Sequence, residues 1–116
     1  MTTQDIKTMI ATIGVPYAYR QFTKETAKAP PFICFFFDGS DNFDADDCVF
    51  QRVESLIVEI YTDTKDFALE EQAEAVFDAN HLPWEKTETV IETEQMHETI
   101  YTLSVMLTPS HPIVTT

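Results

Sequence analysis

The sequence predicts a single α+β domain, in which two helices pack on one face of an antiparallel sheet built from two hairpins and a short strand. Two observations predict this fold: two segments repeat apolar residues at helical spacing, and the rest alternate or run continuously apolar in strand-length pieces. The resulting order is helix, strand, hairpin, helix, hairpin, which is typical of α+β domains. The 116 residues, 44% of them hydrophobic, are enough for one core. We place the domain at residues 1–108 and a flexible tail at residues 109–116.

The first two elements are a short amphipathic helix and a short strand. Thr2 or Thr3 can cap a helix over residues 3–13, and Gly14 can end it. Its apolar stripe consists of Ile6, Met9, Ile10 and Ile13. Residues 17–22, YAYRQF, alternate in character and predict a strand. The polar, proline-terminated segment that follows predicts a loop.

The first hairpin is predicted by two strongly apolar runs. Residues 32–37, FICFFF, suit a central strand covered on both faces, and residues 48–62 are rich in β-branched and aromatic side chains. In the second run, Leu56, Val58 and Ile60 share one face, while Val53, Ile57 and Tyr61 share the other. Pairing the runs keeps Cys34 and Cys48 several residue pairs apart, so we expect free, buried thiols.

The second helix and second hairpin complete the fold. Thr64 or Asp66 can cap a helix that Asn80 ends in a left-handed conformation, with the glutamates at positions 70, 71 and 74 on its solvent side. Residues 83–94 form a polar strand typical of a sheet edge. In residues 98–107, Tyr101, Leu103, Val105 and Leu107 alternate with Thr102 and Ser104, which predicts a strand, and the turn between the two strands is expected near Glu94 to His97. Trp84 and Tyr101 are expected to pack in the core or across the hairpin.

The charge of the chain argues against two classes of ligand. Twenty acidic residues against seven basic ones give a formal charge of −13. Such a charge disfavours binding to nucleic acid or to an anionic membrane. No segment approaches the roughly 20 apolar residues that span a bilayer, and the N-terminus lacks the basic region of a signal peptide. We therefore expect synthesis in the cytoplasm and no membrane partner.

The most unusual segment is an acidic loop, residues 38–47, between the strands of the first hairpin. Its candidate interaction residues are Asp38, Asp41, Asn42, Phe43, Asp44, Asp46 and Asp47. A calcium loop that begins at Asp38 would need glycine where Phe43 stands and glutamate where Val49 stands, so the EF-hand pattern fails. We predict no metal site and no cofactor. Phe43 either docks into a partner or folds back onto the domain.

No spacing in the chain indicates catalysis. The sequence has three histidines, His81, His97 and His111. None of them has a serine, cysteine or carboxylate at a spacing along the sequence that is diagnostic of a catalytic motif. His81 reads as a favourable charge at a helix end, and His97 as a turn residue. Two glycines cannot build a phosphate-binding loop. These observations predict a binding or structural protein rather than an enzyme.

Residues 30–105 resemble the small tail proteins of siphophages and prophages of Gram-positive bacteria. The resemblance lies in PPF before a hydrophobic strand, the SDNFDADD loop, VEIYTDTKD before the helix, and WEK followed by MHETIYTLSV. It covers most of the chain. Asp44 departs from the pattern, since a small residue is expected at its position.

The resemblance implies a tail completion, or tail terminator, protein of the virion. Such a protein caps the tail tube at its head-proximal end and joins it to the head as a hexameric ring, although it can be a monomer in solution. The implied partners are the major tail tube protein, the head connector or completion protein and other copies of the chain. DNA would pass through an acidic lumen without specific binding. Alternatives are another head-tail connector or minor tail component and, more distantly, an acidic metal-binding protein or a DNA-mimicking inhibitor.

Overall fold

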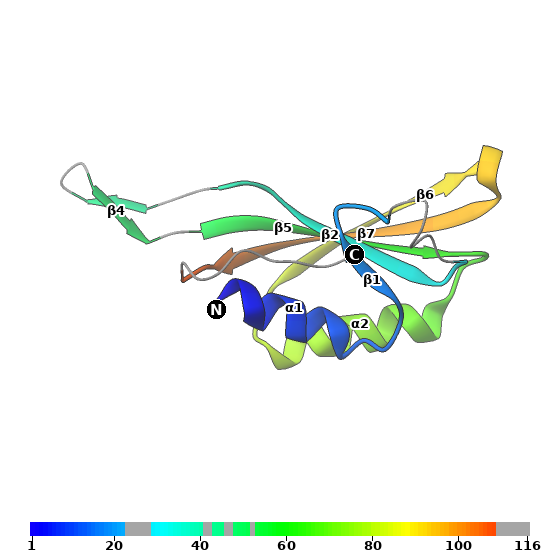
Figure 1. Ribbon diagram of the computed structural model, residues 1–116, viewed down its shortest axis with the longest axis horizontal. Coiled ribbons are helices and arrows are strands. Elements are labelled where there is room, and N and C mark those ends of the chain that lie inside the picture. Colours follow the sequence, from blue (N-terminus) through cyan, green and yellow to red (C-terminus); the bar gives the residue numbers. More distant parts are fainter. Residues whose placement is uncertain (23–28, 41–42, 46–47, 52, 109–116) are drawn as a thin grey trace.

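The α+β prediction is confirmed: a five-stranded, mostly antiparallel sheet carries both helices on one face (Figure 1). The computed structural model describes residues 1–22, 29–40, 43–45, 48–51 and 53–108; of these, residues 40, 43–45 and 48–51 are described by their backbone alone. The expected flexible tail, residues 109–116, lies outside the described residues. Strand order in the main sheet is β1-β2-β5-β7-β6, and β3 and β4 pair separately. The elements are α1 (Thr3–Ala11), β1 (Tyr17–Tyr19), β2 (Phe32–Ser40), β3 (Phe43–Ala45), β4 (Cys48–Gln51), β5 (Val53–Thr62), α2 (Phe67–Ala79), β6 (Trp84–Ile91), the 3₁₀ turn η1 (Glu92–Glu94) and β7 (Met96–Met106).

Helix α1 begins with a capping box. The Asp5 backbone N–H donates to the Thr2 hydroxyl at 3.1 Å, and the Thr2 N–H donates to the Asp5 carboxylate at 2.9 Å. The reciprocal bonds satisfy two N–H groups that would otherwise lack partners at the helix start. The helix ends two residues earlier than predicted, and Gly14 then takes a φ of +94°, which favours glycine. The Gln72 amide of α2 donates to the Ile13 carbonyl and links the two helices.

Helix α2 begins where predicted, but its C-terminal end differs. Asp66 is the cap and accepts from the Leu69 N–H at 3.0 Å. Asn80 is not left-handed: its φ is −95°, and its side-chain amide donates to the Val76 carbonyl at 2.8 Å. His81 takes the left-handed conformation instead, with a φ of 58°. Because the Asn80 side chain bonds back into the helix, the reversal of the chain falls one residue later.

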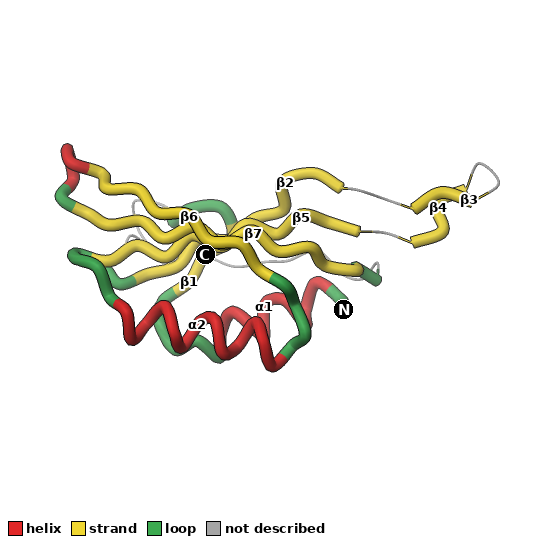
Figure 2. Tube along the Cα trace, turned by 180° about the vertical axis from the view of Figure 1, so that it is seen from behind, coloured by secondary structure: helices red, strands yellow, loops and turns green. Residues whose placement is uncertain are grey.

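The first hairpin is confirmed, and the segment that connects its two strands contains a second pair of strands. Strands β2 and β5 are antiparallel, with Phe32 opposite Tyr61 and Phe37 opposite Leu56. The expected strand over residues 48–62 is divided into β4 and β5, and β4 pairs with β3 inside the acidic segment. Figures 1 and 2 both show β3 and β4 beyond the end of the main sheet, away from the helices. We call β3 and β4 the acidic arm.

One outer strand corrects the expectation of a wholly antiparallel sheet. β1 runs parallel to β2, with Tyr17 opposite Ile33 and Tyr19 opposite Phe35. A tight hairpin would have reversed the direction of the chain. The connection between β1 and β2 instead has the dozen or so residues that a parallel return needs.

The second hairpin, β6–β7, places the polar strand at the sheet edge as predicted. Its turn consists of η1 followed by Gln95 with a φ of 52°. His97, expected in this turn, lies in β7 opposite Val90, so that expectation is wrong. The alternation of strand side chains therefore points His97 to the same face as Thr99 and Tyr101.

The core lies between the sheet and the two helices. Side chains from β2, β5, β7 and both helices fill it, and the predicted stripe of Leu56, Val58 and Ile60 is fully buried. Phe77 of α2 contacts Tyr101 edge to face, with ring centroids 5.2 Å apart. Trp84 packs on the other side of Tyr101 at 5.6 Å, which confirms the packing role predicted for both aromatics. Neither described helix lies on the opposite face of the sheet (Figure 2), and we call it the helix-free face.

Candidate functional site

Three of the predicted interaction residues, Asp38, Phe43 and Asp44, lie on or next to the acidic arm. Asp38 is exposed near the end of β2. Phe43 and Asp44 belong to β3, opposite Gln51 and Val49 of β4. Asp41, Asn42, Asp46 and Asp47 lie outside the described residues. The fold therefore brings Asp38, Phe43 and Asp44 to one end of the molecule.

The helix-free face holds a partly buried pair of carboxylates, from Glu59 of β5 and Glu98 of β7. Glu98 is only 9% exposed. The Tyr61 hydroxyl donates to Glu59 Oε1 at 3.3 Å, and the ring of Tyr61 stacks on Phe32 at 4.8 Å. Apolar side chains therefore surround two acidic groups in the middle of this face.

The surroundings of this pair change how its groups titrate. Burial, a hydrogen bond with Glu98 and the repulsion between the two carboxylates together raise the pKa of Glu59 to about 7. Burial also raises the pKa of Tyr61 well above its usual value. Cys34 lies beside Glu59, and burial raises the pKa of its thiol to about 11. Cys34 is thus a buried, free thiol, as predicted, and its raised pKa disfavours the reactive thiolate. The side chain of Cys48 lies outside the part of the chain that the structure describes.

Replacing Glu59 with glutamine should stabilise the protein at alkaline pH. Because the folded pKa of Glu59 is raised, its stabilising contribution is complete below about 4.5 and is lost as the pH rises through about 7. Allowing for partial solvent screening, we expect E59Q to exceed the wild type by about 1–2 kcal/mol at about pH 8, with the difference vanishing near pH 4. Urea unfolding across this pH range measures it. The exposed Glu85, changed to glutamine, is the matched control, and a constant E59Q difference at every pH would contradict the prediction.

A second polar group lies on the helix-covered face, at the N-terminal half of α2. Glu70 accepts from Lys65 at 2.8 Å and from Lys86 of β6 at 3.1 Å. Lys86 also donates to Glu74 at 2.9 Å, and Glu74 accepts from the Tyr101 hydroxyl at 2.7 Å. The expectation that Glu70 and Glu74 face solvent is therefore wrong: Glu70 is 4% exposed, and only Glu71 is fully on the outer side.

The ion pairs determine how these groups titrate. Burial alone would raise the pKa of Glu70, but hydrogen bonds and attraction from Lys65 and Lys86 lower it below its usual value. The hydrogen bond to Glu74 raises the pKa of Lys86. Burial and Glu74 raise the pKa of the Tyr101 hydroxyl. The lowered pKa of Glu70 and the raised pKa of Lys86 favour their charged forms, and the raised pKa of Tyr101 keeps its hydroxyl as a donor.

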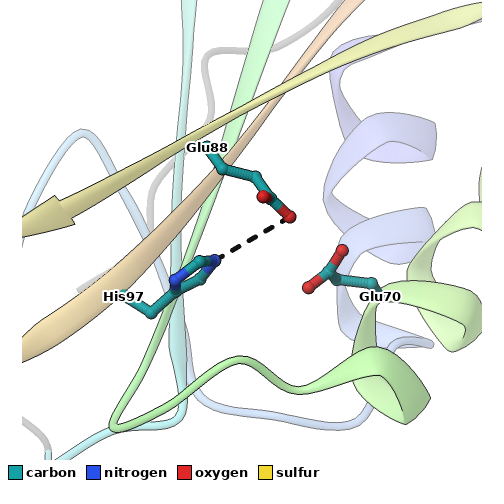
Figure 3. Close-up of side chains that lie close together, drawn as sticks. All are labelled: Glu70, Glu88 and His97. Carbon is teal, nitrogen blue, oxygen red and sulfur yellow. Dashed lines mark ion pairs between the residues drawn. The ribbon is translucent and has the colours of Figure 1, made fainter.

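His97 and Glu88 complete this group, which we call the Glu70 cluster. It comprises Lys65, Glu70, Glu74, Lys86, Glu88, His97 and Tyr101. Lys65 pairs with Glu88 as well as with Glu70. His97 Nε2 lies 3.9 Å from Glu88 Oε1, and Figure 3 shows the side chains of Glu70, Glu88 and His97 converging from α2, β6 and β7.

Sequence reasoning missed the Glu70 cluster, although one signal for it was present. Glu70 stands three residues before Ala73 and seven before Phe77, both fully buried, so it belongs to the core stripe of α2. A glutamate on that stripe requires a cationic partner. The partners come from distant segments, and only the folded chain shows which lysines they are.

The chain matches no protein-family model and no curated protein. Among the described residues, no helix is long and apolar enough to cross a membrane.

Proposed function

We propose that the chain is a non-enzymatic structural protein of a phage-type tail, which caps the tail tube at its head-proximal end and joins the tail to the head as a ring. The resemblance of residues 30–105 to small siphophage tail proteins motivates this proposal. Its partners are the tail tube protein, the head connector or completion protein and further copies of the chain. It is made in the host cytoplasm and acts in the virion.

The structural observation that carries the proposal is the acidic arm. The molecule measures 50 × 28 × 25 Å, and the arm lies at one end of it (Figure 2). A hairpin beyond the sheet offers backbone edges to a neighbouring chain, and strand addition at such an edge is a common mode of docking. The arm contains Phe43, which either docks into a partner or folds back onto the domain, and the proposed role uses the first of these two alternatives. It therefore supplies a surface for contact between subunits or with the tube.

The charge supports the role of a DNA conduit. Each chain carries a formal charge of −13. A ring of such chains repels the phosphates of DNA in its lumen and lets DNA pass without adhesion.

Deletion of the reading frame from the phage or prophage that encodes it tests the function. We expect electron microscopy to show separate DNA-filled heads and free tails, with tails of irregular or excessive length. Normal tailed virions would refute the proposal. Supplying the wild-type chain from a plasmid should restore joined particles and is the positive control.

A shortened chain tests the role of the arm separately. Ser40 and Glu54 are opposite each other in the β2–β5 hairpin, so Asn-Gly in place of residues 41–53 gives a two-residue turn of the favoured kind. We expect this variant to fold, by its circular dichroism and cooperative melting, and to fail to restore joined particles. Full restoration by the folded variant would show that assembly does not use the arm.

A further inference from the structure

The Glu70 cluster contains two buried polar atoms that have no hydrogen-bond partner. Glu70 uses Oε1 for both lysines, and its Oε2 atom is buried and unpaired among the described residues. His97 Nε2 is likewise buried without a hydrogen bond. An unpaired buried acceptor is costly and uncommon in folded proteins. The two atoms therefore point to a ligand that accepts electron pairs from both.

The ligand set suits a metal ion. Glu70, Glu88 and His97 each offer one ligating atom, and these atoms lie within 4.8 Å of one another. In a tetrahedral site with bonds of about 2.1 Å, ligand atoms are about 3.4 Å apart. His97 Nε2 and Glu88 Oε1, at 3.9 Å, need to close by only a fraction of an ångström. One nitrogen and two carboxylate oxygens favour a borderline cation such as Zn²⁺ over the all-oxygen ions Ca²⁺ and Mg²⁺.

We propose that Glu70, Glu88 and His97 bind one divalent transition-metal ion of the Zn²⁺ type, in exchange for the ammonium group of Lys65. Lys65 now bridges Glu70 and Glu88 and so occupies the cation position. The Lys65 side chain is 28% exposed, so its ammonium group can turn toward solvent. The exposed ring of Phe67, whose centre lies 4.9 Å from the Lys65 Nζ atom, lies beside this route. This proposal differs from the expectation of no metal site, which was drawn from the residue spacing of the acidic loop.

The charges of the cluster are consistent with this exchange. Three carboxylates, from Glu70, Glu74 and Glu88, face two ammonium groups, from Lys65 and Lys86, which leaves one negative charge while His97 is neutral. A divalent cation in place of the Lys65 ammonium brings the local sum to zero. Lys86 retains its ion pairs with Glu70 Oε1 and with Glu74. The unpaired atom, Glu70 Oε2, is therefore the one that binds the metal.

The cluster borders solvent at Glu88, whose side chain is 40% exposed. A surface pocket of ≈ 330 Å³ is lined by His97, Lys65 and Asp63, among others. Water from this pocket can complete the coordination at the position that three protein ligands leave open.

Calorimetry on the full chain, stripped of metal with a chelator, tests the proposal. Zn²⁺ should bind once per chain with a dissociation constant below about 10 μM, and Ca²⁺ and Mg²⁺ should bind at least about a hundredfold more weakly. H97Q and E88Q should each weaken zinc binding by at least about thirtyfold. The side chain of Glu88 is 40% exposed, against 13% for His97, so E88Q is expected to fold and provides the test if H97Q unfolds. H81Q, which changes an exposed histidine elsewhere, should bind as the wild type does.

The Lys65 exchange adds a sharper test. K65Q removes the competing ammonium and should tighten zinc binding by about tenfold or more, and one equivalent of Zn²⁺ should shift the imidazole NMR signals of His97. Absence of saturable binding by the wild type at about 100 μM zinc, retained binding in both H97Q and E88Q, or weaker binding in K65Q would each overturn the proposal. The site stands independently of the proposed tail function, since binding is measured on the isolated chain.

Discussion

Replacement of Phe77 with alanine should lower the free energy of unfolding by about 3–5 kcal/mol. Phe77 is fully buried between α2 and the sheet, and it contacts Tyr101 edge to face. The substitution removes the transfer free energy of the ring, leaves a cavity and breaks the aromatic pair. Domains of this size are stable by only about 5–15 kcal/mol, so the loss is a large share of the total. Urea unfolding followed by circular dichroism measures it.

Phe67, ten residues earlier on the same helix, is the matched control. Its side chain is 69% exposed, and its described partner is the Lys65 ammonium. Substitution by alanine should therefore change the free energy of unfolding by less than about 1 kcal/mol. Equal effects at Phe67 and Phe77 would show that α2 does not pack on the sheet through Phe77.

Replacement of Glu70 with alanine should destabilise the metal-free protein by about 2–3 kcal/mol at neutral pH. The change leaves Lys65 and Lys86 without their shared buried acceptor, and loss of one partner of a buried pair costs about 3–5 kcal/mol. We expect about 2–3 kcal/mol rather than the full cost, because both lysine side chains are partly exposed and can be hydrated. Urea unfolding in the presence of a chelator separates this effect from any contribution of a metal.

The pH dependence of the Glu70 variant identifies its cause. Because the folded pKa of Glu70 is lowered, its stabilisation is present above the ordinary value of about 4.5 and is lost as the pH falls through the folded value. The difference between wild type and E70A should therefore shrink in acid. Glu71 to alanine, at the exposed neighbouring position, should have almost no effect at any pH. A difference that persists unchanged at about pH 3 would assign the effect to packing rather than to charge.

Local patterns predicted most of the fold. The apolar spacing of α1 and α2, the caps at Thr2 and Asp66, and the alternation of β5 and β7 are each set by neighbouring residues. The parallel direction of β1 depends instead on where a long connection returns. The division of residues 48–62 into β4 and β5 depends on cross-strand partners inside the acidic segment, which no periodicity specifies.

The Glu70 cluster shows why the candidate site was harder to predict than the fold. Glu70 alone could have been suspected from its place on the core stripe of α2. His97 gave no such signal, because a shift of the turn by two residues moved it from the predicted turn into β7. The cluster joins residues from position 65 to position 101, and its geometry exists only when β6 and β7 pair beside α2. The acidic arm, by contrast, was prominent in the sequence because its composition is local.

The two outer strands of the sheet bear on the behaviour of the protein at high concentration. β1 offers only three residues to an added strand, and β6 carries Glu85 and Glu88 on opposite faces. Antiparallel addition of a second β6 would bring glutamates of two molecules close together, which opposes pairing. Edge-to-edge addition of molecules into open-ended fibrils is therefore disfavoured at both borders of the sheet. The two borders thus limit the loss of the protein to aggregates when its concentration is high.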